Sequence, residues 1–238
     1  MSSYAYAQPK RNVDFVLCID GTAGMTPCID AIKTKFASFL AELTEWIRDS
    51  GVRPIDTLRA KVIVFRDYRD DGEDAMVESV FFDLPDENAD FKGFLSSITV
   101  GGGGDYPENG LEALHFAMNA DFCAGKHDRQ VVLLFSNSDA LELGERKDWA
   151  AYPSDMVDEA DFIRAWGAKK LDRDAEDGCT PAQKNRRMFL FAPPKTRYEL
   201  LSKTLRCCYF EPIENMSAFF DESVPRYLAQ MMGPRIFC

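Results

Sequence analysis

The chain has 238 residues, of which 46% are apolar and 28% are charged, and its formal net charge is −11. This length allows one sizeable α/β domain or two small ones, and the apolar fraction excludes disorder as the main state. The acidic balance argues against a nucleic-acid binder, which needs a concentrated basic surface, and is compatible with a basic protein partner. No stretch approaches the ~18 uninterrupted apolar residues of a membrane span.

The N-terminus and the cysteines bear on location. Residues 1–11 are polar, include Pro9 and lack the apolar core of a secretory signal. The seven cysteines form no C-x-x-C pair, and two histidines are too few to favour a zinc site. We therefore expect a cytoplasmic protein with reduced thiols.

The first element is an apolar run from Phe15 to Ile19, which ends in Asp20. Such a run predicts a buried parallel strand, and polar residues at its carboxyl end lie where open α/β sheets bind ligands. Asp20, Thr22 and Gly24 follow the spacing D-x-T-x-G. The carboxylate and the hydroxyl are hard oxygen ligands of the kind that Mg²⁺ prefers.

Apolar runs and amphipathic segments alternate along the rest of the chain. Strands are expected at 13–19, 61–65, 77–84, 131–135, 188–192 and 207–210. Helices are expected from Pro27 to about Ile47 and at 91–98, 107–119, 156–170, 198–205 and 219–232, with an acidic loop at 172–177. This pattern predicts a single α/β domain over 12–232, between tails at 1–11 and 233–238. The sheet should be Rossmann-like and mostly parallel, with 77–84 as an antiparallel edge strand and helices on both faces.

Three segments carry a family resemblance. The D-x-T-x-G loop resembles the D-x-S-x-S motif of the metal-ion-dependent adhesion site in von Willebrand factor A (VWA) domains. Gly101 to Glu108 resembles the G-G-G-D-x-P-E loop of intracellular bacterial VWA proteins of the TerY-like type, and Val131 to Ala140 resembles the strand that normally ends in T-D. The similarity runs from about Asn12 to Met232.

The resemblance implies a metal site that is altered here. Its residues would be Asp20, Thr22, Asp105 and Asn137, with Gly24, Tyr106, Ser138 and Asp139 at the partner-binding face. Gly24 stands in place of a hydroxyl ligand, and Asn137 in place of an aspartate if residues 131–135 set the register. A slipped register would put Asp139 there instead. We expect Mg²⁺ to bind weakly, or only when a partner supplies an acidic ligand.

The implied function is a non-catalytic interaction module or scaffold, whose partners in the family include kinases, phosphatases and ATPases. One alternative is a degenerate VWA domain that acts as a structural subunit without metal; another is a metal-dependent hydrolase. Catalysis is not expected, because neither His115 nor His127 falls at a predicted strand end. Ser136 and Ser138 also lack a G-x-S-x-G elbow.

Overall fold

A computed structural model describes residues 11–36, 38, 55–104, 107–169 and 180–213. Asp105, Tyr106, the acidic loop 172–177, the expected helix 219–232 and both expected tails except Arg11 lie outside these ranges, as do residues 39–54.

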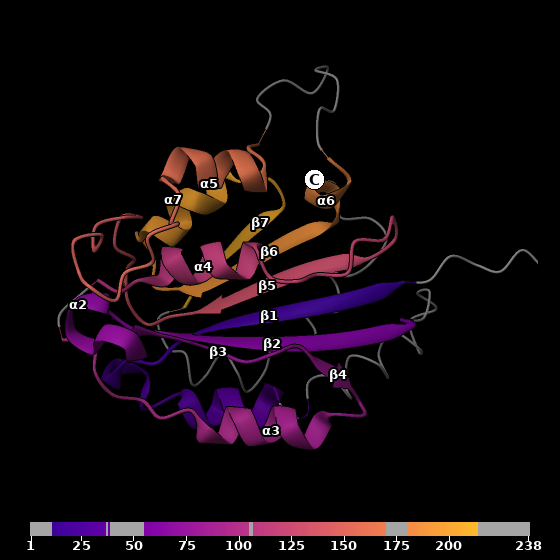
Figure 1. The fold of residues 1–238 in the computed structure, drawn as a ribbon, viewed down its shortest axis with the longest axis horizontal. Helices are drawn as coiled ribbons and strands as arrows, with labels where there is room; N and C mark the ends of the chain where they lie inside the picture. Colours follow the sequence, from indigo (N-terminus) through magenta and orange to yellow (C-terminus); the bar gives the residue numbers. More distant parts are fainter. Residues whose placement is uncertain (1–10, 37, 39–54, 105–106, 170–179, 214–238) are drawn as a thin grey trace, which may run out of the picture.

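The described residues form one mixed sheet of seven strands (Figure 1). The strands are β1 (Asn12–Asp20), β2 (Thr57–Phe65), β3 (Met76–Glu78), β4 (Phe82–Leu84), β5 (Arg129–Phe135), β6 (Arg186–Ala192) and β7 (Cys208–Pro212). Their order is β3-β2-β1-β5-β6-β7, and β4 also pairs with β2. The expected α/β fold with a mostly parallel sheet is confirmed.

Strand β1 is central, with β2 parallel to it on one side and β5 parallel on the other. Ile19 aligns with Val64 on β2 and with Phe135 on β5, so the carboxyl ends of the three strands meet at one edge. The chain passes to opposite sides of β1, and ligands of open α/β sheets bind at such a switch point. Asp20 is the last residue of this strand.

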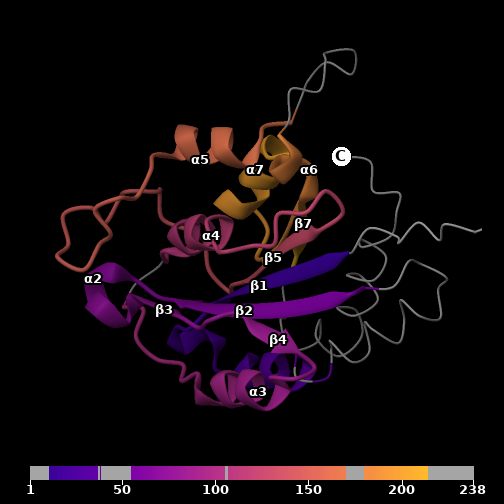
Figure 2. The same ribbon diagram turned by 45° about the vertical axis from the view of Figure 1, so that its right-hand side comes forward.

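Helices cover both faces of the sheet (Figure 1). Helical residues 29–36 and α3 (Asn88–Ser97) lie on one face, and α4 (Gly110–Met118), α5 (Glu159–Trp166) and α7 (Arg197–Thr204) on the other. The short elements are η1 (Ala23–Met25), α2 (Tyr68–Asp71), η2 (Gly72–Ala75) and α6 (Pro181–Asn185). Figure 2 shows α2 and the connection after β5 at the same end of the sheet, where β1, β2 and β5 finish.

The alternation along β1 divides the core into two halves. Phe15, Leu17 and Ile19 face the cluster that includes α3, whereas Val16 and Cys18 face the cluster that includes α4, α5 and α7. All five side chains are at most 1% exposed. Burying a large apolar side chain contributes about 1.5–3 kcal/mol, so this strand is strongly fixed and its carboxyl end is a rigid support.

The expected edge strand 77–84 is two short strands instead of one. Both β3 and β4 run antiparallel to β2. The break begins at Ser79, whose hydroxyl accepts from Val62 N at 2.9 Å and donates to Val80 O at 2.7 Å. A side chain here replaces a backbone acceptor, so the regular ladder is interrupted.

The cysteines differ from the expectation at one position. Cys18, Cys28, Cys123 and Cys208 are free, but Cys207 is disulfide-bonded. The prediction that every thiol is reduced is therefore wrong, and it no longer supports a cytoplasmic location. Among the described residues, no helix is long and apolar enough to cross a membrane.

Candidate metal and partner site

Asp20 is fully buried at the carboxyl end of β1, and the loop that follows wraps around its carboxylate. Oδ1 accepts from the backbone N of Thr22 at 2.9 Å and from its hydroxyl at 2.7 Å. Burial raises the pKa of Asp20, and the hydrogen bonds from Thr22, Ser136 and the backbone of Asn137 oppose that rise. Because the Thr22 hydroxyl donates its hydrogen to Asp20, the lone pairs of its oxygen remain available to bind a cation or accept a hydrogen bond.

Ser136, the first residue of the loop after β5, contacts the same carboxylate. It follows β5, next to Asp20 because Ile19 and Phe135 are paired. Its hydroxyl donates to Asp20 Oδ2 at 2.8 Å, and Ser138 N donates to that hydroxyl at 3.1 Å. The site residues expected from sequence did not include Ser136. Its position directly after a strand parallel to β1 was the available signal.

Gly24 and Asn137 face one another. A Cβ placed on Gly24 would lie 2.3 Å from Asn137 Nδ2 and 3.2 Å from its Oδ1. The amide of Asn137 therefore takes the space of a side chain at Gly24. Asn137 is beside the D-x-T-x-G loop, as the register set by residues 131–135 predicts.

Asp139, the alternative residue in the loop after β5, accepts hydrogen bonds from backbone N–H groups instead. Its Oδ1 accepts from Ala140 N and from Arg197 N, both at 2.7 Å. Arg197 is the first residue of α7, where a carboxylate is favoured by the helix dipole. Ser138 is buried, and its hydroxyl donates to Asp139 O at 3.0 Å. The slipped register is thus not the one adopted.

Glu108 is the described residue of the second motif that reaches the site. Gly103, with φ of +65°, lies between Thr22 and Glu108: an added Cβ would be 2.4 Å from Thr22 Cγ2 and 2.7 Å from Glu108 Oε1. Glu108 is 3% exposed, and its Oε2 is buried without a hydrogen-bond partner among the described residues. A side chain at Gly103 would separate the two motifs.

The position of Glu108 corrects the expected helix start at Pro107. Glu108 N donates to Asp139 O at 3.1 Å, and Leu141 N donates to Glu108 O at 2.8 Å. These bonds hold Glu108 in a short parallel bridge with Ala140, and α4 begins two residues later. Glu108 is consequently not a first-turn helix residue.

Acidic neighbours dominate the electrostatics of Glu108. Burial raises its pKa to about 8, and the charges of Asp20, Asp67, Asp71 and Asp70 add to the rise. A buried carboxyl group among other carboxylates is one that a cation would stabilise.

Arg66 ties the surrounding loops together. Its guanidinium donates to the carbonyl oxygens of Gly21 at 3.2 Å, Gly101 at 3.1 Å, Thr99 at 2.7 Å and Asp74 at 2.8 Å. These bonds join the loop after β1, residues 99–101 and η2 to the end of β2. The backbone around Asp20 is therefore tied together rather than formed by independent loops.

The donor set fits a hard divalent cation in part. Asp20, Glu108 and the Thr22 hydroxyl offer oxygen atoms, and Glu108 Oε2 has no hydrogen-bond partner within the described part of the chain. The described residues contain no group of three or more acidic, histidine or cysteine side chains arranged to hold a metal. A complete shell would therefore need water, Asp105 or an acidic ligand from another molecule.

The sequence matches no family model and no curated protein. Among solved structures, it is similar to the pilus adhesin SpaC from Lactobacillus rhamnosus GG, with 13% identity, a TM-score of 0.55, and coverage of 94% of this chain and 31% of the adhesin. The open conformation of SpaC gives a TM-score of 0.50, at 13% identity and 94% and 30% coverage. Proximal thread matrix protein 1 from the mussel byssus, described with a zinc-occupied MIDAS motif, gives 0.44 at 12% identity, with 92% and 46% coverage.

These similarities concern the fold. The chain spans less than half the length of each of these proteins. The similarity to SpaC, together with the sheet order, supports a mostly parallel α/β fold for this chain.

Proposed function

We propose that this chain is a non-catalytic protein-interaction module that binds its partner through the loops at the carboxyl ends of β1, β2 and β5. The observation that carries the proposal is the buried oxygen cluster of Asp20, Thr22 and Glu108, in which Glu108 Oε2 accepts no hydrogen bond from any described residue. Three separate loops converge there, and Arg66 holds the surrounding backbone.

We propose Mg²⁺ as the cation of this cluster. Asp20, Thr22 and Glu108 would hold it, with Asn137 at the edge and Asp105 as a further ligand. The ion would offer an open coordination position to a carboxylate of the partner. Because Asn137 replaces a charged ligand, the affinity of the free protein should be weak.

The finer assignment follows the sequence resemblance. The G-G-G-D-x-P-E form supports an intracellular protein of the bacterial TerY-like type, which would scaffold an assembly with kinase, phosphatase or ATPase components. Any such activity would belong to the partner. Non-catalytic action is supported by Ser136, whose hydroxyl donates to the Asp20 carboxylate rather than to a histidine base.

A structural subunit without metal is the second candidate. It is favoured by the hydrogen bonds that Asp20 already receives from its own chain, three of them with distances of 2.7–2.9 Å. In that case Asp20 would hold the three loops together and a chelator would change nothing.

A matched pair of variants separates the two candidates. Asn137→Asp adds a carboxylate beside the cluster, whereas Asp139→Asn removes one that holds the start of α7. Calorimetric titration with Mg²⁺ should show higher affinity for Asn137→Asp and unchanged affinity for Asp139→Asn. If both variants and the native chain fail to take up Mg²⁺ while remaining folded, the structural candidate is preferred.

A further inference from the structure

The segment 142–158, which is part of the connection from β5 to α5, is held against the body of the protein by contacts to two buried carboxyl groups. The first is an ion pair between Arg146 and Asp67: Nε donates to Oδ1 at 2.8 Å and Nη2 donates to Oδ2 at 2.8 Å. Asp67 is fully buried and the Arg146 side chain is 13% exposed. A two-point arginine–carboxylate contact fixes orientation as well as distance.

The second contact is made by Tyr152. Its hydroxyl donates to Glu112 Oε1 at 2.8 Å and accepts from Gly144 N at 2.9 Å. Its ring also packs edge-on against Tyr68, with centroids 5.2 Å apart. Glu112 is fully buried on α4, so Tyr152 joins the segment to the core.

Trp149 lies between these two anchors and is 45% exposed. Its backbone N donates to Arg146 O at 3.0 Å, and Tyr152 N donates to Trp149 O at 2.9 Å. The residue that carries the exposed indole is thus hydrogen-bonded to both anchor residues. A backbone that is already held in place loses little conformational freedom on binding, and tryptophan is enriched among residues that dominate interface energies.

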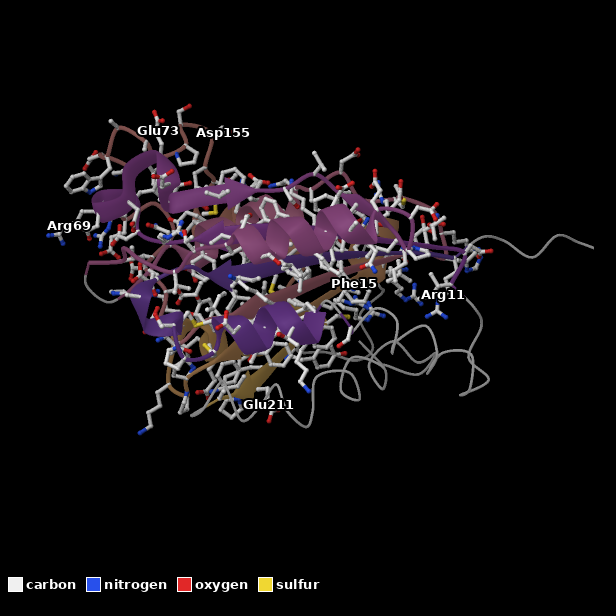
Figure 3. The ribbon with its side chains drawn as sticks, turned by 90° about the horizontal axis from the view of Figure 1, so that it is seen from below. Arg11, Phe15, Arg69, Glu73, Asp155 and Glu211 are labelled. Carbon is white, nitrogen blue, oxygen red and sulfur yellow. The ribbon has the colours of Figure 1, made fainter. Side chains whose placement is uncertain are left out.

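The two segments joined by these anchors carry much of the negative charge of the chain. Segment 67–74 has five carboxylates and one arginine, and segment 142–158 has five carboxylates and two basic residues, so together they hold seven of the eleven excess negative charges. The exposed carboxylates are Asp70, Glu73, Asp74, Glu142, Glu145, Asp148, Asp155 and Asp158. Figure 3 shows Glu73 and Asp155, one from each segment, at the same end of the molecule, with Arg69 at that end as well.

We propose that segments 67–74 and 142–158 form a docking surface for a basic protein segment, with Trp149 packing on an apolar residue of that segment. The inference rests on the proposed interaction function but uses residues outside the cation cluster. The occupant is assigned by charge complementarity, because exposed carboxylates on the two segments, together with an exposed tryptophan on one of them, favour lysine or arginine beside an apolar group. Docking here requires no divalent ion.

The test uses two short synthetic peptides, one of alternating lysine and leucine and one with glutamate in place of lysine. With the full chain, the basic peptide should bind, lose affinity as salt is raised, and bind equally well in chelator. Trp149→Ala should weaken binding about tenfold or more. Leu200→Ala, which truncates another exposed apolar residue (62% exposed, on α7), should change it less than about twofold.

Charge variants locate the surface. The double variant Glu73→Lys with Asp155→Lys should strongly weaken binding of the basic peptide. The control double variant Asp86→Lys with Asp90→Lys, near the start of α3, makes the same change in net charge and should weaken binding less. Equal losses from the two charge pairs, or equal affinities for Trp149→Ala and Leu200→Ala, would overturn the proposal. If Mg²⁺ uptake also fails, the cation proposal falls separately, because peptide binding is measured in chelator.

Discussion

The amide of Asn137 occupies the space in front of the α-carbon of Gly24, so close that a Cβ on Gly24 would lie 2.3 Å from Asn137 Nδ2. Gly24 departs from the D-x-S-x-S pattern and Asn137 from the T-D pattern, and the two residues pack against each other. A side chain can be introduced at Gly24 when that of Asn137 moves or is shortened.

This relationship predicts non-additive variants at positions 24 and 137. Gly24→Ser alone should destabilise the fold by about 1–2 kcal/mol, because overpacking forces neighbouring side chains to shift. Gly24→Ser combined with Asn137→Ala should recover most of that loss in urea unfolding. Strict additivity of the two single changes would show that the positions do not share this space.

A second close contact joins Gly110, at the start of α4, to Tyr198 on α7. A Cβ on Gly110 would lie 1.8 Å from the Tyr198 hydroxyl. Gly110→Ala should cost about 2–3 kcal/mol, since the ring is fully buried. Tyr198→Phe removes the obstructing oxygen, so the double variant should be more stable than Gly110→Ala. A double variant no more stable than Gly110→Ala would contradict this contact.

The raised pKa of Glu108 predicts a pH dependence of stability in chelated protein. The folded-state pKa of about 8 exceeds the ordinary value of 4.5, so the folded state binds this proton more tightly. The contribution of Glu108 is fully present below about pH 4.5 and is lost as pH rises to about 8. Glu108→Gln lacks this loss, so its advantage over the native chain in urea unfolding should grow between pH 5 and 8. An advantage that is constant with pH would rule out a raised pKa.

The ion pair of Arg146 with Asp67 should be far more important for stability than exposed pairs. Arg146→Ala leaves a fully buried carboxylate without its guanidinium and should cost about 3 kcal/mol. The side chain of Arg164, which pairs with Asp161, is 74% exposed, so Arg164→Ala should cost less than about 0.5 kcal/mol. Thermal or urea unfolding of both variants gives the comparison, and similar losses would mean that segment 142–158 is not anchored as described.

The sequence predicted the parts of the fold that depend on local pattern. The run Phe15–Ile19, its end at Asp20 and the register of Asn137 are confirmed, because buried strands require continuous apolar residues. The local pattern after Pro107 places Glu108 in a helix. It does not show the bridge between Glu108 and Ala140, because these residues are 32 positions apart in the chain. The Arg146–Asp67 pair likewise depends on a contact between distant segments, which composition and periodicity do not report.

The most direct test of the cation cluster is a calorimetric Mg²⁺ titration of the native chain and of Asp20→Asn. Both proteins are first stripped with chelator and then held in excess acetate, which stands in for a partner carboxylate. The proposal predicts saturable Mg²⁺ uptake by the native chain, stronger with acetate than without it, and loss of that uptake in a folded Asp20→Asn protein. Uptake that is equal in the two proteins, or absent from the native chain with acetate present, would contradict it.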